Sequence, residues 1–358
     1  MILTEVKHWG LTKNNERVLA YTLKNEFLEI TILNYGGIIQ KIMMPDKNGK
    51  KENIVLGFDD LKSYEERSPQ FGAIVGRTAG RIKDGKLKIG DKIYQLKKNN
   101  FNNNLHGYPE FYGTKIWDGN LEEDGEKIVL TLTRTSPHLE ANYPGNVEFT
   151  IKYILEKNKL ILEYFGIPDR DTYINLTNHT YFNLSGNSKE NIGNQIITLS
   201  SDEYLEVDKE TIPTKFSRVD SSIFDLRGGR RFKEIFNSPH QQIKIVNGGM
   251  DHPFILSDNK ENSVKAYNEK NINAKCYDEK SGRELSLCTT EPVIVLYTGN
   301  YLDEVGKISN GIMCEKHFGF CLETQDYPDV FKVISEKGKI YNNECRYYQK
   351  TAFIFNLL

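Results

Sequence analysis

A short run of polar and aromatic residues near the middle of the chain carries side chains suited to proton transfer. Residues 176–184 read LTNHTYFNL. We expect a β-strand here, and its period of two would place His179, Tyr181 and Asn183 on one face. Such a polar row suits a hydroxyl-rich ligand, and an imidazole can move a proton near neutral pH. The alternative is a half-exposed strand with a hydrogen-bonded histidine.

A second candidate is a carboxylate near the C-terminal end. In residues 318–325 the alternation places Phe318, Phe320 and Leu322 on one bulky apolar face, which we expect to pack into a core. Glu323 would lie on the opposite face among smaller residues, as in a strand that borders a ligand cleft. An ordinary exposed glutamate at a strand end is the alternative.

Three further polar residues stand in apolar or glycine-rich surroundings. His106 ends a polar loop, Asp251 lies between a glycine pair and the start of a strand, and Arg81 lies in the glycine-rich residues 71–82. A turn-capping role is the alternative for Asp251. The glycine spacing does not fit a dinucleotide fingerprint. Since metal-ligand spacing, a nucleophile elbow and a phosphate loop are also missing, we expect a site without metal or cofactor.

Short strands must position these side chains. Alternating or β-branched residues predict strands at 27–33, 127–135, 147–155 and 159–165, and residues 156–158 predict a hairpin between the last two. Residues 59–66 and 217–224 predict at best short helical turns. Many strands, little helix and no βαβ rhythm favour an all-β fold, an antiparallel sandwich or barrel-like architecture. With no linker of biased composition, we expect a single domain over residues 1–358.

The bulk composition excludes several classes of partner. The 47 Lys and Arg residues nearly balance 49 Asp and Glu, so we expect neither nucleic acid nor an anionic membrane surface as a partner. No apolar run approaches the ~18 residues of a membrane span, and the first ten residues lack a signal-peptide core. The five cysteines form no Cys-x-x-Cys pair. We therefore expect a protein of the reducing cytoplasm, either a monomer or a homodimer.

Taken together, these motifs resemble those of the aldose 1-epimerase (galactose mutarotase) family over nearly the full chain. The landmarks follow the family's order at residues 34–37, 76–82, 104–107, 143–146, 177–184, 251–254, 297–300 and 322–325. Each motif is weak alone, whereas eight in sequence are specific. The resemblance implies a large antiparallel β-sandwich with a shallow sugar cleft. It also implies the interconversion of α and β anomers of a free aldohexose, with no cofactor.

The resemblance also implies roles for individual residues. By motif position, Glu323 resembles the family's catalytic base and His179 its catalytic acid. The remaining matched positions bind or line the sugar site, and they are Arg81, His106, Asp251 and Tyr181.

Two departures from the family pattern leave the preferred sugar open. Some members have Asn where this chain has Gly80, and a ligand-contacting Gln of relatives aligns with Val295. Neither change removes the acid or the base, so glucose, galactose and other aldoses all stay open.

Rival functions remain open from the sequence. A glycosidase could use Asp251 and Glu323 as its carboxylate pair. A non-catalytic sugar-binding sandwich would need no protonatable pair. Within the family, the substrate could instead be the reducing end of a disaccharide such as maltose, or a hexose phosphate. A phosphate site would need extra arginines at the cleft rim, and the candidates are Arg227, Arg230 and Arg231.

Overall fold

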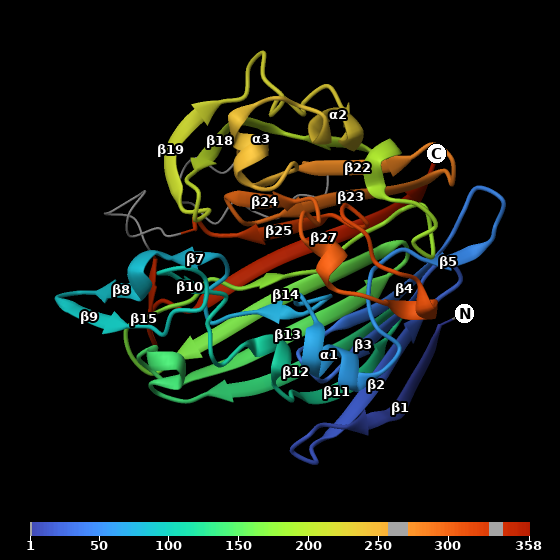
Figure 1. Ribbon diagram of the computed structural model, residues 1–358. Coiled ribbons are helices and arrows are strands. Elements are labelled where there is room, and N and C mark those ends of the chain that lie inside the picture. The colour runs from blue at the N-terminus through green and yellow to red at the C-terminus, as the bar shows by residue number, and fades with distance from the viewer. Residues whose placement is uncertain (1, 257–270, 329–338) are drawn as a thin grey trace.

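The chain folds almost entirely into β-strands, arranged in three main sheets (Figure 1). The computed structural model describes residues 2–256, 271–328 and 339–358. Within these ranges every pair of labelled strands is antiparallel. Antiparallel sheets commonly bury one face and leave the other in water, so a sandwich follows when such faces meet.

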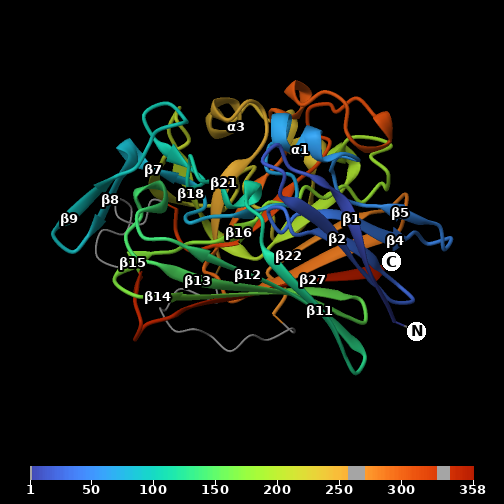
Figure 2. The same ribbon diagram turned by 90° about the horizontal axis from the view of Figure 1, so that it is seen from below.

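The largest sheet has nine strands. Its strand order is β11 (Asp118–Asp124), β12 (Lys127–Ser136), β13 (Val147–Glu156), β14 (Lys159–Pro168), β27 (Tyr347–Leu357), β23 (Arg283–Thr289), β22 (Ala274–Asp278), β17 (Ile196–Leu199) and β20 (Arg230–Arg231). Figure 2 shows β12, β13, β14 and β27 together in one layer, with β18 and β21 above it.

Two five-stranded sheets complete the main framework. The first runs in the order β1 (Leu3–Leu11), β2 (Arg17–Lys24), β3 (Glu29–Leu33), β4 (Ile39–Pro45) and β5 (Lys51–Asn53). The second runs in the order β19 (Pro213–Arg218), β18 (Ser201–Val207), β21 (Asp251–Leu256), β24 (Val293–Tyr297) and β25 (Cys321–Gln325).

Short elements connect the sheets. The two-stranded pairs are β6 (Ile74–Val75) with β16 (Thr177–Asn178), β7 (Arg81–Ile82) with β10 (Asn104–Leu105), β8 (Lys86–Ile89) with β9 (Lys92–Gln95), and β15 (Thr172–Tyr173) with β26 (Ile340–Tyr341). The α-helices in the described ranges are α1 (Leu61–Arg67), α2 (Phe232–Phe236) and α3 (Gln241–Ile245). None of them has the length and apolar character that a membrane-crossing helix needs.

The alternation of residues along each strand explains which face is buried. In β13, Phe149, Ile151 and Tyr153 are fully buried, whereas Glu148 is exposed. One continuous core then joins the sheets, because Ile32 of β3 belongs to the same buried cluster as Ile151. The cluster also includes Leu296 of β24 and Phe355 of β27. The prediction of a large antiparallel β-sandwich with few short helices is confirmed.

Most predicted strands are confirmed with small shifts of their ends. The strand predicted at residues 27–33 is β3, and the other three are β12, β13 and β14. The predicted hairpin joins β13 to β14, where Glu156 pairs with Lys159. Where residues 59–66 predicted at best a short helical turn, the chain forms the seven-residue α-helix α1 over Leu61–Arg67. There the Asp60 carboxylate accepts the N–H of Ser63 at 2.8 Å and caps the helix.

The continuous strand predicted at residues 176–184 is wrong. Only β16 is regular strand, and Phe182 forms isolated bridges with Val55 and Phe320. Local hydrogen bonds compete with a ladder here, because the Asn178 side chain accepts both the backbone N–H and the hydroxyl of Thr180. The segment is therefore threaded between other strands and buried on both sides.

Candidate active site

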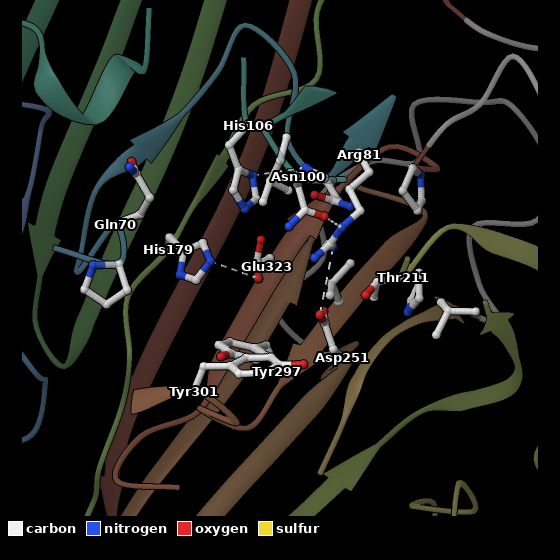
Figure 3. Close-up of a pocket in the computed structure, with 18 of the residues that line it drawn as sticks. Gln70, Arg81, Asn100, His106, His179, Thr211, Asp251, Tyr297, Tyr301 and Glu323 are labelled. Atoms are coloured by element: carbon white, nitrogen blue, oxygen red, sulfur yellow. Dashed lines mark hydrogen bonds and ion pairs between the residues drawn. The ribbon is translucent and has the colours of Figure 1, made fainter. Parts of the chain in front are cut away.

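A cavity of about 590 Å³ lies over the face of the second five-stranded sheet that carries Asp251, Tyr297 and Glu323, and the segments that contain β7 and β10 also line it. Its volume is within the range of roughly 300–1,000 Å³ that is usual for small-molecule sites. All six residues that the family resemblance assigned to the site line it, namely Arg81, His106, His179, Tyr181, Asp251 and Glu323. Figure 3 shows five of them around a common space, with the Glu323 carboxyl near its centre.

Glu323 and His179 face each other across this cavity. The Oε1 atom of Glu323 lies 3.5 Å from Nε2 of His179 (Figure 3). Both residues are buried, with 4% and 5% of their surface exposed. The alternative of an ordinary exposed glutamate is therefore wrong for Glu323. A carboxyl and an imidazole at this separation can exchange or share a proton, and both can reach one ligand.

The strand β25 fixes the Glu323 side chain from behind. Leu322 points into the main core, and Thr324 contacts the hydroxyl of Thr351 in β27 at 2.7 Å. The amide of Gln349 donates to the Thr324 carbonyl at 2.9 Å. Because neighbouring side chains on a strand point to opposite faces, this anchorage to the nine-stranded sheet turns Glu323 toward the cavity. The predicted alternation of residues 318–325 is confirmed at these positions.

His179 is held by its backbone and by a ring of aromatic side chains. Its N–H donates to the Ala73 carbonyl at 2.9 Å, and its carbonyl accepts the N–H of Gly72 at 3.0 Å. The imidazole lies 5.0 Å from the Tyr181 ring, centroid to centroid, and 5.5 Å from that of His106. The ring is thus packed from several sides, and its Nε2 faces Glu323.

Tyr181 contributes its ring rather than its hydroxyl. The phenol donates to the backbone carbonyl of Pro69 at 3.2 Å, and the ring packs edge-on against Tyr297 at 5.9 Å. Gly319 allows this close packing, since a side chain there would meet Tyr181 and Leu56 at about 3.0 Å. The residue therefore shapes the cavity wall.

His106 presents one defined tautomer when it is neutral. The N–H of Gly80 donates to its Nδ1 at 3.2 Å, so the ring proton of a neutral His106 is on Nε2. The residue has a φ of 58°, in the left-handed region, and its own N–H donates to the Gly80 carbonyl at 3.1 Å. This reciprocal pair of bonds between the β7 and β10 segments aims the ring at the cavity.

Arg81 and Asp251 form the opposite wall. The guanidinium Nη1 lies 3.9 Å from Oδ2 of Asp251, and Nε donates to the Asn100 side chain at 2.9 Å. Asp251 is the first residue of β21 and pairs in register with Tyr297 of β24. The alternative of a turn cap does not describe Asp251, because its carboxylate faces the arginine in the cavity (Figure 3).

Burial shifts the pKa values of the paired groups in opposite directions. Desolvation, and then the negative charge of Asp251, raise the pKa of Glu323 to about 8, while Arg81 opposes the shift. Desolvation lowers the pKa of His179 to about 4. The pKa of Asp251 is also raised by burial and lowered in part by Arg81. Strongly shifted groups that converge in a cavity are typical of acid–base sites.

Two sequence interpretations need correction. Asn183 does not share the polar row of His179 and Tyr181, because its buried amide donates to the carbonyls of Glu190 and Phe318. It holds the chain rather than a ligand. The proposed rim arginines do not line the cavity either. Arg227, for example, pairs with Asp202, Asp220 and Asp225 at the surface.

Several lining residues were missed by sequence reasoning. Tyr297 and Tyr301 lie beneath the Glu323 carboxyl in Figure 3, and Asn100 and Gln70 line the sides. A signal existed for Tyr297, which begins one of the family motifs. The other three lie in loops, where residue type alone gave no sign of a site.

The two departures from the family pattern also lie at this cavity, since Gly80 and Val295 both line it. Val295 pairs in register with Glu323 across β24 and β25. Among the His, Cys, Asp and Glu residues that the structure describes, no group of three is arranged to hold a metal ion.

Comparisons with known proteins point to one family. The profile of the family described as aldose 1-epimerase matches residues 19–351. Galactose mutarotase from Homo sapiens is 36% identical over 314 residues, which cover 87% of this chain and 86% of that protein. Aldose 1-epimerase from Haemophilus influenzae is 31% identical over 340 residues, which cover 93% of this chain and 94% of that one.

A solved structure gives the same result for the fold. Galactose 1-epimerase from Lactobacillus acidophilus NCFM superposes with a TM-score of 0.85 at 28% identity, covering 100% of this chain and 99% of the other. The architecture is thus that of the galactose mutarotase-like β-sandwiches. Within that class, the chain belongs to the aldose 1-epimerase family.

Proposed function

We propose that the protein interconverts the α and β anomers of a free aldohexose of the glucose or galactose type. The observation that carries the proposal is the Glu323–His179 pair, whose reacting atoms lie 3.5 Å apart and whose side chains are buried at the cavity. The membership of the family and the names of the relatives, which refer to galactose and to aldoses, support the same reaction.

Ring opening needs one base and one acid that act on the same carbon. The base takes the proton of the C1 hydroxyl, and the acid gives a proton to the ring oxygen, which is also bonded to C1. The open aldehyde rotates about the C1–C2 bond, and the ring closes with both proton transfers reversed. In our proposal Glu323 is the base and His179 the acid, since their proximity lets them serve these two neighbouring oxygens together.

The shifted pKa values are compatible with this assignment, because the resting pair and the reactive pair hold the same number of protons. Between pH 4 and pH 8, the raised pKa of Glu323 and the lowered pKa of His179 favour a protonated carboxyl and a neutral imidazole. The reactive ion pair, with Glu323 charged and His179 protonated, holds the same single proton. Moving that proton across 3.5 Å converts one form into the other without exchange with solvent.

The remaining lining residues supply binding. Arg81 and the Nε2–H of His106 are hydrogen-bond donors, and Asp251 is an acceptor, so together they suit the hydroxyl groups of a sugar. The rings of Tyr181 and Tyr297 offer apolar surface for the C–H faces of the sugar. These groups would hold the sugar while its C1 end turns.

Polarimetry tests the proposal directly. Freshly dissolved α-galactose or α-glucose is followed as its optical rotation decays, with the wild type and with Glu323→Gln. We expect the wild type to accelerate the decay and the variant to lose most of that acceleration. A decay at the spontaneous rate with wild type would refute the reaction, and an active Glu323→Gln would refute the base.

The rival functions are less well supported. The relatives reported above are named for galactose or aldoses, so a disaccharide such as maltose is not favoured as the substrate. A glycosidase that uses Asp251 and Glu323 would release nitrophenol from a nitrophenyl glycoside, and we expect no release. A non-catalytic sugar-binding β-sandwich would leave the decay of the optical rotation at its spontaneous rate.

We also retain three predictions from the sequence as proposals. One continuous core that includes residues of all three main sheets supports a single domain over residues 1–358. The location in the cytoplasm and the choice between monomer and homodimer stay predictions, which fractionation and light scattering would test.

A further inference from the structure

A cysteine contacts the proposed catalytic acid on the side away from the reaction. The Sγ atom of Cys321 lies 3.4 Å from Nδ1 of His179, whereas Nε2 of the same ring faces Glu323 at 3.5 Å. Cys321 is fully buried, and it lies two residues before Glu323 in β25, so both side chains project from the same face of the strand.

We propose that Cys321 is a positioning residue that keeps a proton on Nδ1 of His179 and so reserves Nε2 for the reaction. This inference rests on the proposed anomer interconversion. Nδ1–H donates to the thiol sulfur, which is a weak acceptor. A neutral His179 then has a lone pair on Nε2, and the protonated form carries its labile proton there. In a neutral histidine, the hydrogen bond made by one ring nitrogen decides where the proton lies. The contact at Nδ1 therefore leaves Nε2 for the reaction.

The proton balance is consistent through the whole cycle. Nε2–H of the protonated imidazole gives its proton to the ring oxygen, and Nε2 regains a proton when the ring closes. Nδ1 keeps its proton throughout, and the thiol keeps its own hydrogen. Burial raises the pKa of Cys321 well above its usual value, so the sulfur stays a thiol and takes no part in proton transfer.

The surroundings of the ring leave few other partners for Nδ1. Among the described residues, the faces and edges of the imidazole are covered by the rings of Tyr181, His106 and Tyr297. A hydrogen bond with the backbone of His179 itself raises the pKa of the ring, against the larger lowering by burial.

A weak acceptor at this position has a chemical consequence. A carboxylate beside Nδ1 would stabilise the imidazolium and make it a poorer acid. A neutral thiol orients the ring with little such stabilisation, so the protonated imidazole remains a strong proton donor toward the ring oxygen.

Nuclear magnetic resonance of ¹⁵N-histidine-labelled protein tests the tautomer without turnover. The chain has seven histidines, and the His179 signals are identified by their loss in His179→Gln. We expect the Nδ1–H tautomer for neutral His179 in the wild type and a shift toward Nε2–H in Cys321→Ala. Cys321→Ser, whose hydroxyl can also accept, should restore the wild-type tautomer.

Kinetics supply the second readout, with Cys276→Ala as the matched control, because Cys276 is also fully buried but belongs to β22 and not to β25 beside His179. We expect Cys321→Ala to lower kcat about tenfold with KM little changed, by analogy with the loss of a hydrogen-bond partner of a metal-binding histidine, which costs roughly 10–100-fold. Cys321→Ser should recover most of kcat, and Cys276→Ala should retain it.

An Nε2–H tautomer in the wild type, or an unchanged tautomer or kcat in Cys321→Ala, would overturn the proposal. If the wild type shows no anomer conversion, the proposed function fails instead, while the tautomer experiment still decides the role of the thiol contact.

Discussion

Nε2 of His179 lies 3.5 Å from Oε1 of Glu323, although the two residues are 144 positions apart in the chain (323 − 179). The contact exists because Phe182 bridges to Phe320, which draws the His179 segment against the start of β25. An imidazole and a carboxyl that are both deeply buried, at this distance, form a pair that carries one proton at neutral pH.

Removal of the Glu323 carboxylate should abolish most of the catalysis. We expect Glu323→Gln to reduce kcat by about 10²–10⁴-fold, which is the usual contribution of a positioned base, and to change KM little. Polarimetry with α-galactose measures both constants.

The matched control for this variant is Glu291→Gln. Glu291 is also buried and has a pKa raised to about 8, but it does not line the cavity. Equal losses in the two variants would show that the effect comes from a buried carboxyl in general and not from the reaction site.

The pH dependence of kcat/KM should be bell-shaped. Activity requires the Glu323–His179 pair to hold one proton, and burial places the limiting pKa values near 4 and 8. Below the lower value both groups are protonated and no base remains. Above the upper value both are deprotonated and no acid remains. Rates from pH 3.5 to 9.5, corrected for the spontaneous reaction, give the two limbs, and an optimum outside this window would contradict the assignment.

The same buried carboxyl should weaken the fold at high pH. Because the pKa of Glu323 is raised from 4.5 to about 8, its contribution to stability is full below pH 4.5 and is lost as the pH rises towards 8. Glu323→Gln has no such charge, so we expect it to be more stable than wild type by about 1–3 kcal/mol at pH 8.

Thermal unfolding at two pH values checks this expectation. The gain in Tm should be present at pH 8 and vanish near pH 4, where the wild-type carboxyl is already neutral. A gain of equal size at both values would point to packing rather than to charge.

Loss of the Arg81 guanidinium should impair binding and shift one limb of the pH profile. We expect Arg81→Met to raise KM by about 10–100-fold, the usual effect of losing a charged hydrogen-bond donor. Since Arg81 lowers the pKa of Glu323, the upper limb should also move to higher pH. Arg227→Met is the control, because Arg227 lies outside the cavity, and it should leave both KM and the limb unchanged.

The framework of the molecule could be predicted because strand periodicity is local. The alternation in β12, β13 and β14 is visible in the sequence and sets which face is buried. The strand prediction for residues 176–184 failed because the alternation of residue types there does not come from pairing with a neighbouring strand. Side-chain hydrogen bonds such as that of Asn178 hold the segment instead.

The sequence by itself determined the residue types that can do the chemistry, the all-β class and the family, since these depend on local pattern and motif order. Only the tertiary structure decided that Glu323 and His179 share one cavity, that Asn183 does not, and that Cys321 contacts Nδ1. The physical reason is that sheet packing sets distances between residues remote in the chain, and burial then sets their pKa values.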